Sequence, residues 1–293
     1  MTTTITQLPA QSPTHPTVTP AQPRAGHTAA SERVQSIDML RGFDMFWISG
    51  GDELFHALAL ASGWAWTVFC SKQLQHTAWA GFTFYDLIMP LFLFITGITL
   101  PLSVGRRLAR GETRAQIFRR LLTRTLLLII LGHLDKNGAI SLDFANQRYT
   151  SVLGRIGVAS LAAGSIMMFC KARAQVAWIV CLLAGYWALL TFVPAPGQPA
   201  PSYEQGVNIV DYLDQRVMPG KLKSGNHDAI GWCSTPPAVA TVLFGALAGA
   251  WLLGTRGAKQ KAIGLLAAGA ALVVLGWGWS FRFPIIKHIW TSS

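Results

Sequence analysis

The chain has 293 residues, of which 51% are hydrophobic and only 13% are charged. A soluble domain carries about a quarter charged residues, so this composition excludes an ordinary soluble protein. The formal net charge of +11 could suggest a nucleic-acid partner, but the basic residues gather in short segments between apolar blocks. That distribution is typical of a membrane protein, and we expect no nucleic-acid partner.

Residues 1–31 are rich in Thr, Pro, Gln and Ala and show no apolar periodicity. This composition is typical of a disordered tail. The segment also lacks the basic start and apolar core of a signal peptide. We therefore expect a disordered cytoplasmic tail over residues 1–31 and a transmembrane domain over residues 32–293, whose first helix serves as its own signal anchor.

The rest of the chain contains apolar blocks of roughly 20 residues, the length that crosses the hydrocarbon core of a bilayer as a helix. The expected fold class is all-α, a polytopic membrane helical bundle with about seven transmembrane helices. The expected spans are 37–56, 83–104, 116–134, 151–170, 174–193, 236–254 and 262–280.

The charges of the connecting segments alternate along the chain. Arginines are concentrated between the second and third spans, and Lys171, Arg173 and Arg256 fall in the next even-numbered junctions. Acidic residues lie almost entirely in the other junctions. The positive-inside rule then places the N-terminus in the cytoplasm and makes 57–82 and 194–235 the two largest exoplasmic loops.

The segment from His76 to Asp86 leads directly into the second span. An ionisable residue at such a place costs several kcal/mol unless it has a partner or a role, and histidine is well suited to proton transfer near neutral pH. Helix N-terminal amides favour an ionised Asp86, which can fix the tautomer of His76. The alternative is an interfacial histidine beside a capping aspartate, without a chemical role.

Asp38, Arg41 and Asp44 follow one another at a spacing of three residues in the first span. Residues three apart lie on the same face of a helix. Two interpretations remain open from the residues alone. The three side chains form a self-satisfied ion cluster near the cytoplasmic end, or they form a polar wall along the path of a cofactor.

Further polar residues occur near the expected exoplasmic ends of the helices. Arg155 opens the fourth span, and His227 with Asp228 precedes the sixth. The histidines lack metal-ligand spacing such as HExxH, and the chain contains no Walker loop or dinucleotide fingerprint; we expect no metal site. Cys70 and Cys233 both fall in exoplasmic loops, so a disulfide between them is left open.

Five blocks of the sequence resemble, in the right order, the motifs of one known family. The blocks are 36–44, 76–97, 148–156, 228–238 and 283–293. The family is the transmembrane acyltransferases typified by heparan-α-glucosaminide N-acetyltransferase, in particular its bacterial homologues. The resemblance covers roughly residues 33–293.

This resemblance implies transfer of an acetyl group from cytosolic acetyl-CoA, as co-substrate, to the amino group of a terminal glucosamine across the membrane. The essential histidine of the family falls on His76, as general base or as acetyl carrier. The candidate residues are His76 and Asp86 for catalysis, Trp79, Arg155, His227 and Asp228 for substrate binding, and Asp38, Arg41 and Asp44 for cofactor binding.

The expected partners are a saccharide acceptor and membrane lipids, with a homodimer left open. The expected localisation is the bacterial inner membrane. Two features depart from the family. Its members usually continue past residue 293, so we expect a C-terminally truncated chain. Asp228 is followed by Ala229 and Ile230 where relatives commonly carry Pro-Glu, which leaves the identity of the acceptor open.

Two other function classes compete with the acyltransferase. A polytopic transporter or channel with a polar exoplasmic vestibule would have the same composition, although the chain shows no broken-helix repeat in two matching halves. A non-catalytic membrane component of an envelope assembly is the third class.

Overall fold

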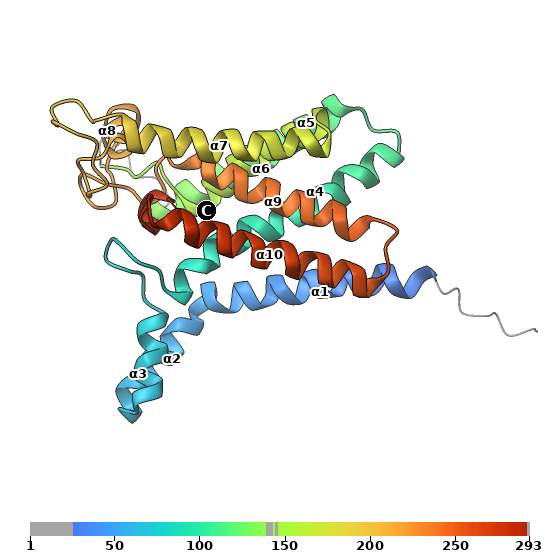
Figure 1. The fold of residues 1–293 in the computed structure, drawn as a ribbon, viewed down its shortest axis with the longest axis horizontal. Coiled ribbons are helices and arrows are strands. Elements are labelled where there is room, and N and C mark those ends of the chain that lie inside the picture. Colours follow the sequence, from blue (N-terminus) through green and yellow to red (C-terminus); the bar gives the residue numbers. More distant parts are fainter. Residues whose placement is uncertain (1–25, 139–142, 144–145, 292–293) are drawn as a thin grey trace, which may run out of the picture. The chain divides into compact units, whose positions relative to one another are not determined.

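A computed structural model describes residues 26–138, 143 and 146–291 (Figure 1). The chain divides into two compact units, residues 1–38 and residues 39–293. Most of the expected N-terminal tail lies outside the described residues, and helix α1 begins at Gly26. Apart from Asp38, all of the candidate site residues belong to the second unit.

The described residues form helices, two isolated β-bridges and no strand, which confirms the all-α fold class. Short turns of helix precede α2 (Trp47–Gly51), precede α4 (Phe84–Leu87) and follow α10 (Lys287–Ile289). The α-helices are α1 Gly26–Phe46, α2 Asp52–Ser62, α3 Ala65–Gln73, α4 Ile88–Ala109, α5 Arg114–Asn137, α6 Val152–Phe169, α7 Ala172–Phe192, α8 Ile209–Val217, α9 Thr235–Leu253 and α10 Ala258–Ser280.

Five helical segments are long and apolar enough to cross a membrane, so the expected count of seven spans is not confirmed. Helix α5 occupies the third expected span, but Arg119, Arg120 and Arg124 interrupt its apolar stretch. The first expected span, 37–56, does not form one helix, because α1 ends at Phe46. The five segments are Phe84–Ala109, Val152–Phe169, Ala172–Phe192, Thr235–Leu253 and Ala258–Ser280.

Helices α4 and α9 form the centre of the bundle, with α6 and α7 packed against α9 and α5 against α6. Glycine allows α4 and α9 to approach closely. A Cβ atom at Gly97 would overlap the carbonyl oxygen of Val242, and one at Gly245 would overlap that of Phe94. Small residues at such contacts are a general feature of membrane helix pairs.

The segment between α1 and α4 brings the candidate site to the bundle. The helix direction changes at Gly50, whose φ of 111° favours glycine. Helices α2 and α3 then pack against each other as a hairpin (Figure 1). This hairpin occupies much of the expected exoplasmic loop 57–82, and the chain returns through residues 74–87 to the start of α4.

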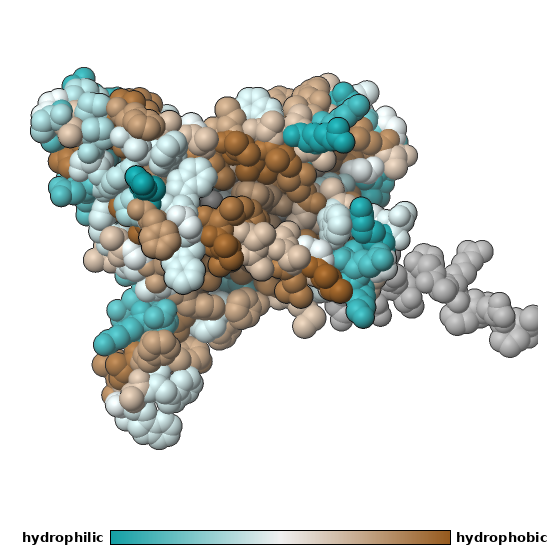
Figure 2. Space-filling view, viewed as in Figure 1, coloured by the Kyte–Doolittle hydropathy of each residue, from teal (hydrophilic) through white to brown (hydrophobic). Residues whose placement is uncertain are grey.

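The surface has the polarity of a membrane protein. Hydrophobic residues gather over the middle of the face shown in Figure 2, and hydrophilic residues lie toward its two ends. Helix α10 presents large apolar side chains to the outside, among them Leu266 at 73% exposure and Val273 at 70%. Such a helix is suited to contact with lipid tails.

Candidate active site

The pair predicted from the sequence, His76 and Asp86, forms a direct contact. His76 Nδ1 lies 2.7 Å from Asp86 Oδ1. Asp86 is only 1% exposed, and its second oxygen accepts hydrogen bonds from the backbone N–H and the hydroxyl of Thr83, at 3.2 and 3.0 Å. These bonds form a capping box at the turn that leads into α4, a device that fixes the first turn of a helix.

This geometry leaves one nitrogen of His76 free for chemistry. A carboxylate can only accept hydrogen bonds, so Nδ1 carries the proton that it donates to Asp86, and the neutral ring keeps a lone pair on Nε2. The side chain of His76 is 45% exposed, whereas that of Asp86 is fully buried. Asp86 therefore holds the imidazole of His76 from its buried side, while part of the ring stays accessible to a ligand.

Lys287 is a third member of the cluster, and it was not among the predicted site residues. Its Nζ lies 3.1 Å from Asp86 Oδ1 and 3.1 Å from His76 Nδ1. The backbone N–H of Gly81 donates to the carbonyl of Ile285 at 2.9 Å, which ties the two segments together. The only sequence signal was its place in the fifth family-like block, because its partners lie about two-thirds of the chain away.

Burial and Lys287 together determine the charge of the histidine. Burial lowers the pKa of His76, the positive charge of Lys287 lowers it further, and the hydrogen bond to Asp86 opposes both. Burial also lowers the pKa of Lys287, against the attraction of Asp86. A lowered pKa keeps the imidazole neutral at neutral pH, which is the form that a base or a nucleophile needs.

Trp79 joins this cluster to a second histidine. Its indole N–H donates to the carbonyl of Tyr203 at 3.0 Å. Its ring stacks on His288, with centroids 5.6 Å apart, and meets the ring of His227 edge to face at 4.8 Å. His227 in turn lies 2.6 Å from a carboxylate oxygen of Asp211. Of this group, His288 and Asp211 were not predicted.

Asp228 and Arg155 both hold the segment before α9. Asp228 accepts two hydrogen bonds from Arg148, at 2.9 and 2.7 Å, and one from Thr150 at 2.6 Å. Burial alone would raise the pKa of Asp228, but these hydrogen bonds lower it. Arg155, 4% exposed, donates to the carbonyls of Ala229 and Gly231 and to Ser234. Their partners in the structure are therefore protein groups.

The three residues expected to line a cofactor path lie on α1. Asp38 is exposed and Arg41 is half-buried. Asp44 is fully buried, and neither of its carboxylate oxygens has a hydrogen-bond partner in the described part of the chain. Its neighbours Phe43 and Trp47 contact the ring of Phe84, at 6.5 and 5.5 Å. Asp44 therefore belongs to the stretch of α1 that packs beside the turn carrying Asp86.

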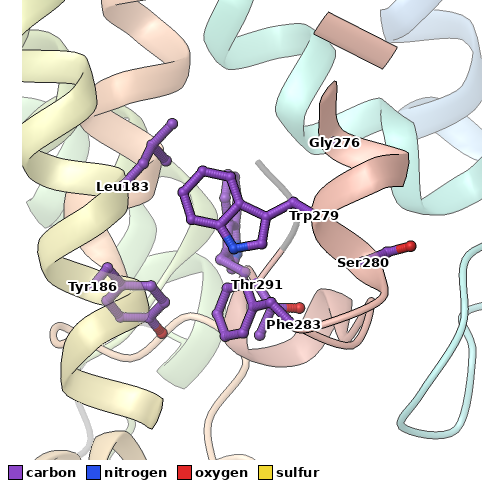
Figure 3. A pocket seen from close by; sticks show the side chains of 8 residues that line it. Leu183, Tyr186, Gly276, Trp279, Ser280, Phe283 and Thr291 are labelled. Carbon is purple, nitrogen blue, oxygen red and sulfur yellow. The ribbon is translucent and has the colours of Figure 1, made fainter. Parts of the chain in front are cut away.

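A small pocket of about 50 Å³ lies between α7 and α10 and is not lined by His76 (Figure 3). Four of its eight lining residues are aromatic: Tyr186, Trp279, Phe283 and Trp290. Trp290 packs under the guanidinium of Arg155, 5.2 Å from ring centroid to Cζ. Through Trp290 the pocket adjoins Arg155, which holds the segment before α9, and His76 does not line it.

Two further expectations concern cysteine and metal. All four cysteines are free, including Cys70 and Cys233, so the disulfide that the sequence left open does not form in the structure. No group of three or more His, Cys, Asp or Glu side chains in the searched, described residues has the arrangement of a metal site.

Comparison with known proteins indicates the same family as the five sequence blocks. No family model matches the chain. The human heparan-α-glucosaminide N-acetyltransferase is 27% identical over 198 residues, a match that covers 59% of this chain and 28% of the human protein. The Mus musculus protein of the same name is 29% identical over 151 residues, covering 43% of this chain and 23% of its own length. The matches support membership of this family, and they span only about a quarter of each relative's length.

Proposed function

We propose that this membrane protein, a relative of the heparan-α-glucosaminide N-acetyltransferases, transfers an acetyl group from acetyl-CoA to the amino group of an amino sugar. The observation that carries the proposal is the His76–Asp86 pair, in which a buried carboxylate contacts Nδ1 of a histidine whose side chain is 45% exposed. The acceptor class is an amino sugar of the glucosamine type, bound on the exoplasmic side.

The chemistry needs one group that takes a proton and returns it. His76 Nε2 removes a proton from the acceptor amine as the nitrogen attacks the thioester carbonyl, so that a C–N bond forms and the C–S bond breaks. The same nitrogen then returns the proton to the departing thiolate of CoA. Asp86 stabilises the imidazolium between these steps, as a buried carboxylate does in a catalytic triad.

A covalent route uses the same atom. In that route Nε2 attacks the thioester carbonyl, a C–N bond to the imidazole forms, and the C–S bond breaks with release of CoA as thiolate. The amine then attacks the acetyl carbon, the bond to Nε2 breaks, and the proton that the amine loses is taken up by Nε2 and balances the released thiolate. Both routes begin with a neutral imidazole, which the lowered pKa of His76 favours. The geometry is compatible with either route. Release of free CoA in the absence of acceptor would indicate the covalent route, because only that route breaks the thioester before the amine binds.

The donor side of the site is proposed to include α1. Arg41 suits a phosphate group of CoA because a guanidinium binds phosphate in a bidentate manner. The unpaired carboxylate oxygens of Asp44 suit the amide N–H groups of the pantetheine arm. Asp38 belongs to the first compact unit, so the proposed wall is limited to Arg41 and Asp44.

The acceptor side is proposed to include Trp79 and His227, with Arg155 and Asp228 shaping the segment beneath them. Trp79 lies three residues from His76 in the chain and contacts His227 directly. Ligand sites combine apolar surface with a few well-placed polar groups, and this group has that character.

The test uses the purified chain in lipid nanodiscs with radiolabelled acetyl-CoA and glucosamine. We expect labelled N-acetylglucosamine and free CoA in equal amounts. A parallel assay in sealed vesicles follows labelled glucosamine alone. Uptake that does not require acetyl-CoA, without any acetylated product, would contradict the proposal and favour the transporter class.

A further inference from the structure

A second histidine–carboxylate pair lies beside the first, and its environment is different. His227 is 3% exposed and Asp211 is 1% exposed, whereas the side chain of His76 is half-exposed. The pair comes from α8 and from the segment that precedes α9. Trp79 packs against one side of the His227 ring, at 4.8 Å, and His288 against another, at 5.7 Å.

The neighbours of Asp211 determine which nitrogen of His227 carries the proton. One oxygen of Asp211 accepts from the backbone N–H of Gly206 and from the side-chain amide of Asn208, both at 2.7 Å. The side-chain oxygen of Asn208 accepts the backbone N–H of Asp211 at 2.9 Å, which fixes the orientation of that amide. The other oxygen of Asp211 is 2.6 Å from His227 Nδ1. Nδ1 is therefore the donor, and the neutral ring keeps its lone pair on Nε2.

That lone pair has no partner. Nε2 of His227 is buried and makes no hydrogen bond within the described part of the chain. Buried polar atoms in folded proteins nearly always have a partner, because an unpaired one loses its hydrogen bonds to water without compensation. Nε2 of His227 is therefore a hydrogen-bond acceptor held in place between two aromatic rings, and its missing partner indicates that a bound ligand supplies the donor.

We infer that His227 Nε2 accepts a hydrogen bond from a ring hydroxyl of the amino-sugar acceptor, with Asp211 as the positioning residue that holds the acceptor nitrogen toward it. This inference rests on the proposed function, in which His76 takes the proton of the amine. His76 and Trp79 are three residues apart, at most about 11 Å along the chain, and His227 contacts Trp79. One sugar bound at Trp79 can thus present its amine to His76 and a hydroxyl to His227.

The inference gives the site a selectivity that the His76 pair alone lacks. An amine is the only group that acetyl transfer requires, so many amines would satisfy His76. A buried acceptor rejects a ligand that leaves it unpaired, and such rejection is stronger than that of an apolar pocket. The His227–Asp211 pair therefore selects an amine that also carries a hydroxyl group.

The kinetic test compares glucosamine with its 3-, 4- and 6-deoxy analogues as acceptors for the full chain in nanodiscs. We expect one analogue to lose at least about tenfold in kcat/KM. His227→Phe should lose a similar factor with glucosamine and should no longer distinguish that analogue. Asp211→Asn should reproduce the effect in weaker form, since it frees the tautomer. His56→Phe is the matched control, because His56 bonds to Ser71 within the α2–α3 hairpin, and it should keep the wild-type pattern.

The inference is overturned if all three analogues serve as well as glucosamine, or if His227→Phe retains the discrimination. Equal activity of the three analogues is the result expected if a buried water, and not a sugar hydroxyl, donates to His227 Nε2. Nitrogen NMR of the ¹⁵N-histidine-labelled wild-type chain gives a reading that does not depend on turnover. We expect an unprotonated Nε2 on His227, assigned with His227→Gln, whose resonance shifts when glucosamine is added.

A protonated Nε2, or a resonance that saturating glucosamine leaves unmoved, would overturn the inference. Acetyl transfer at His76 and hydroxyl binding at His227 can be refuted separately. Absence of acetyl transfer to any amine, with a His227 resonance that responds to glucosamine, would refute the proposed reaction and keep the hydroxyl site. Acetyl transfer at equal rates to glucosamine and its three deoxy analogues would support the proposed reaction and refute the hydroxyl site.

Discussion

At the scale of single residues, the site depends on charges that surround one imidazole. Asp86 lies behind the ring of His76 and Lys287 lies beside both, with each contact at 3.1 Å or less. The carboxylate stabilises an imidazolium, and the ammonium opposes it. This balance favours the neutral form of His76, the form that the proposed reaction needs at its start.

Replacement of Lys287 by Met tests that balance. The Lys287 charge lowers the pKa of His76, and Asp86 raises it, so removal of the lysine should raise the pKa of His76. Because activity requires the neutral ring and is lost as pH falls through this pKa, the acid limb of the pH–activity profile should move to higher pH. Lys287→Arg keeps the charge and is the matched variant. An unchanged or downward shift in Lys287→Met would contradict this electrostatic role.

The sequence predicted part of this cluster and missed part of it for a physical reason. His76 and Asp86 are ten residues apart and directly precede the apolar helix α4, so local patterns reveal them. Lys287 is 211 residues from His76, and only the folded chain brings them together. His227 was identified as a polar residue near a helix end, but its partner Asp211 and the buried Nε2 are consequences of packing.

At the scale of helices, the apolar blocks predicted most of the elements. Five expected spans correspond to helices long and apolar enough to cross a membrane: 83–104, 151–170, 174–193, 236–254 and 262–280. The region 57–82 was expected as one exoplasmic loop, yet most of it forms the α2–α3 hairpin. The break that separates it from α1 is set by the φ of 111° at Gly50, and a sequence pattern does not indicate which glycine takes such a value.

The α4–α9 contact gives a test at this scale. A Cβ at Gly245 would overlap the backbone of Phe94, whereas one at Gly269 on α10 meets nothing within 4 Å. Overpacking typically costs about 1–3 kcal/mol, and each kcal/mol shifts the Tm of a protein of this size by about 2–4 °C. Gly245→Ala should therefore lower the Tm by several degrees, measured by thermal unfolding in detergent.

Gly269→Ala is the matched control and should leave the Tm within about a degree, since the added methyl faces open space. Equal Tm values for the two variants would contradict the close approach of α4 and α9. Since these helices pack at the centre of the bundle that carries the turn at Asp86, a lowered Tm in Gly245→Ala should be accompanied by weaker acetyl transfer.

At the scale of the whole molecule, the proposed function requires that His76 and Asp86 face the exoplasmic side of the membrane. Helix α4 has 22 residues and is therefore about 33 Å long. It begins beside Asp86 and ends at Ala109, with Arg106 and Arg107 in its last turn and Arg110 directly after it. The positive-inside rule predicts that Arg110 faces the cytoplasm and that the end of α4 beside Asp86 faces the outside, and this orientation stays a prediction.

Cysteine labelling tests that orientation in a background in which the native cysteines are replaced. Arg110 and Gln205 are both exposed, and Gln205 lies close in the chain to Tyr203, which bonds to Trp79. Gln205→Cys should react with a membrane-impermeant thiol reagent in intact cells, with any outer membrane permeabilised. Arg110→Cys should react only after the cells are disrupted. The reverse pattern would move the site to the cytoplasmic side.

The most direct measurement for the whole account is the rate of acetyl transfer from acetyl-CoA to glucosamine by His76→Ala, in nanodiscs and with unchanged helix content and Tm. Removal of a proton-transfer residue lowers a rate by about 10²–10⁴, and we expect at least that loss. Asp86→Asn should lose less, and the double variant should be no slower than His76→Ala, because orientation has no value without the base. Wild-type turnover by His76→Ala would contradict the catalytic role of His76 and with it the mechanism derived from this site.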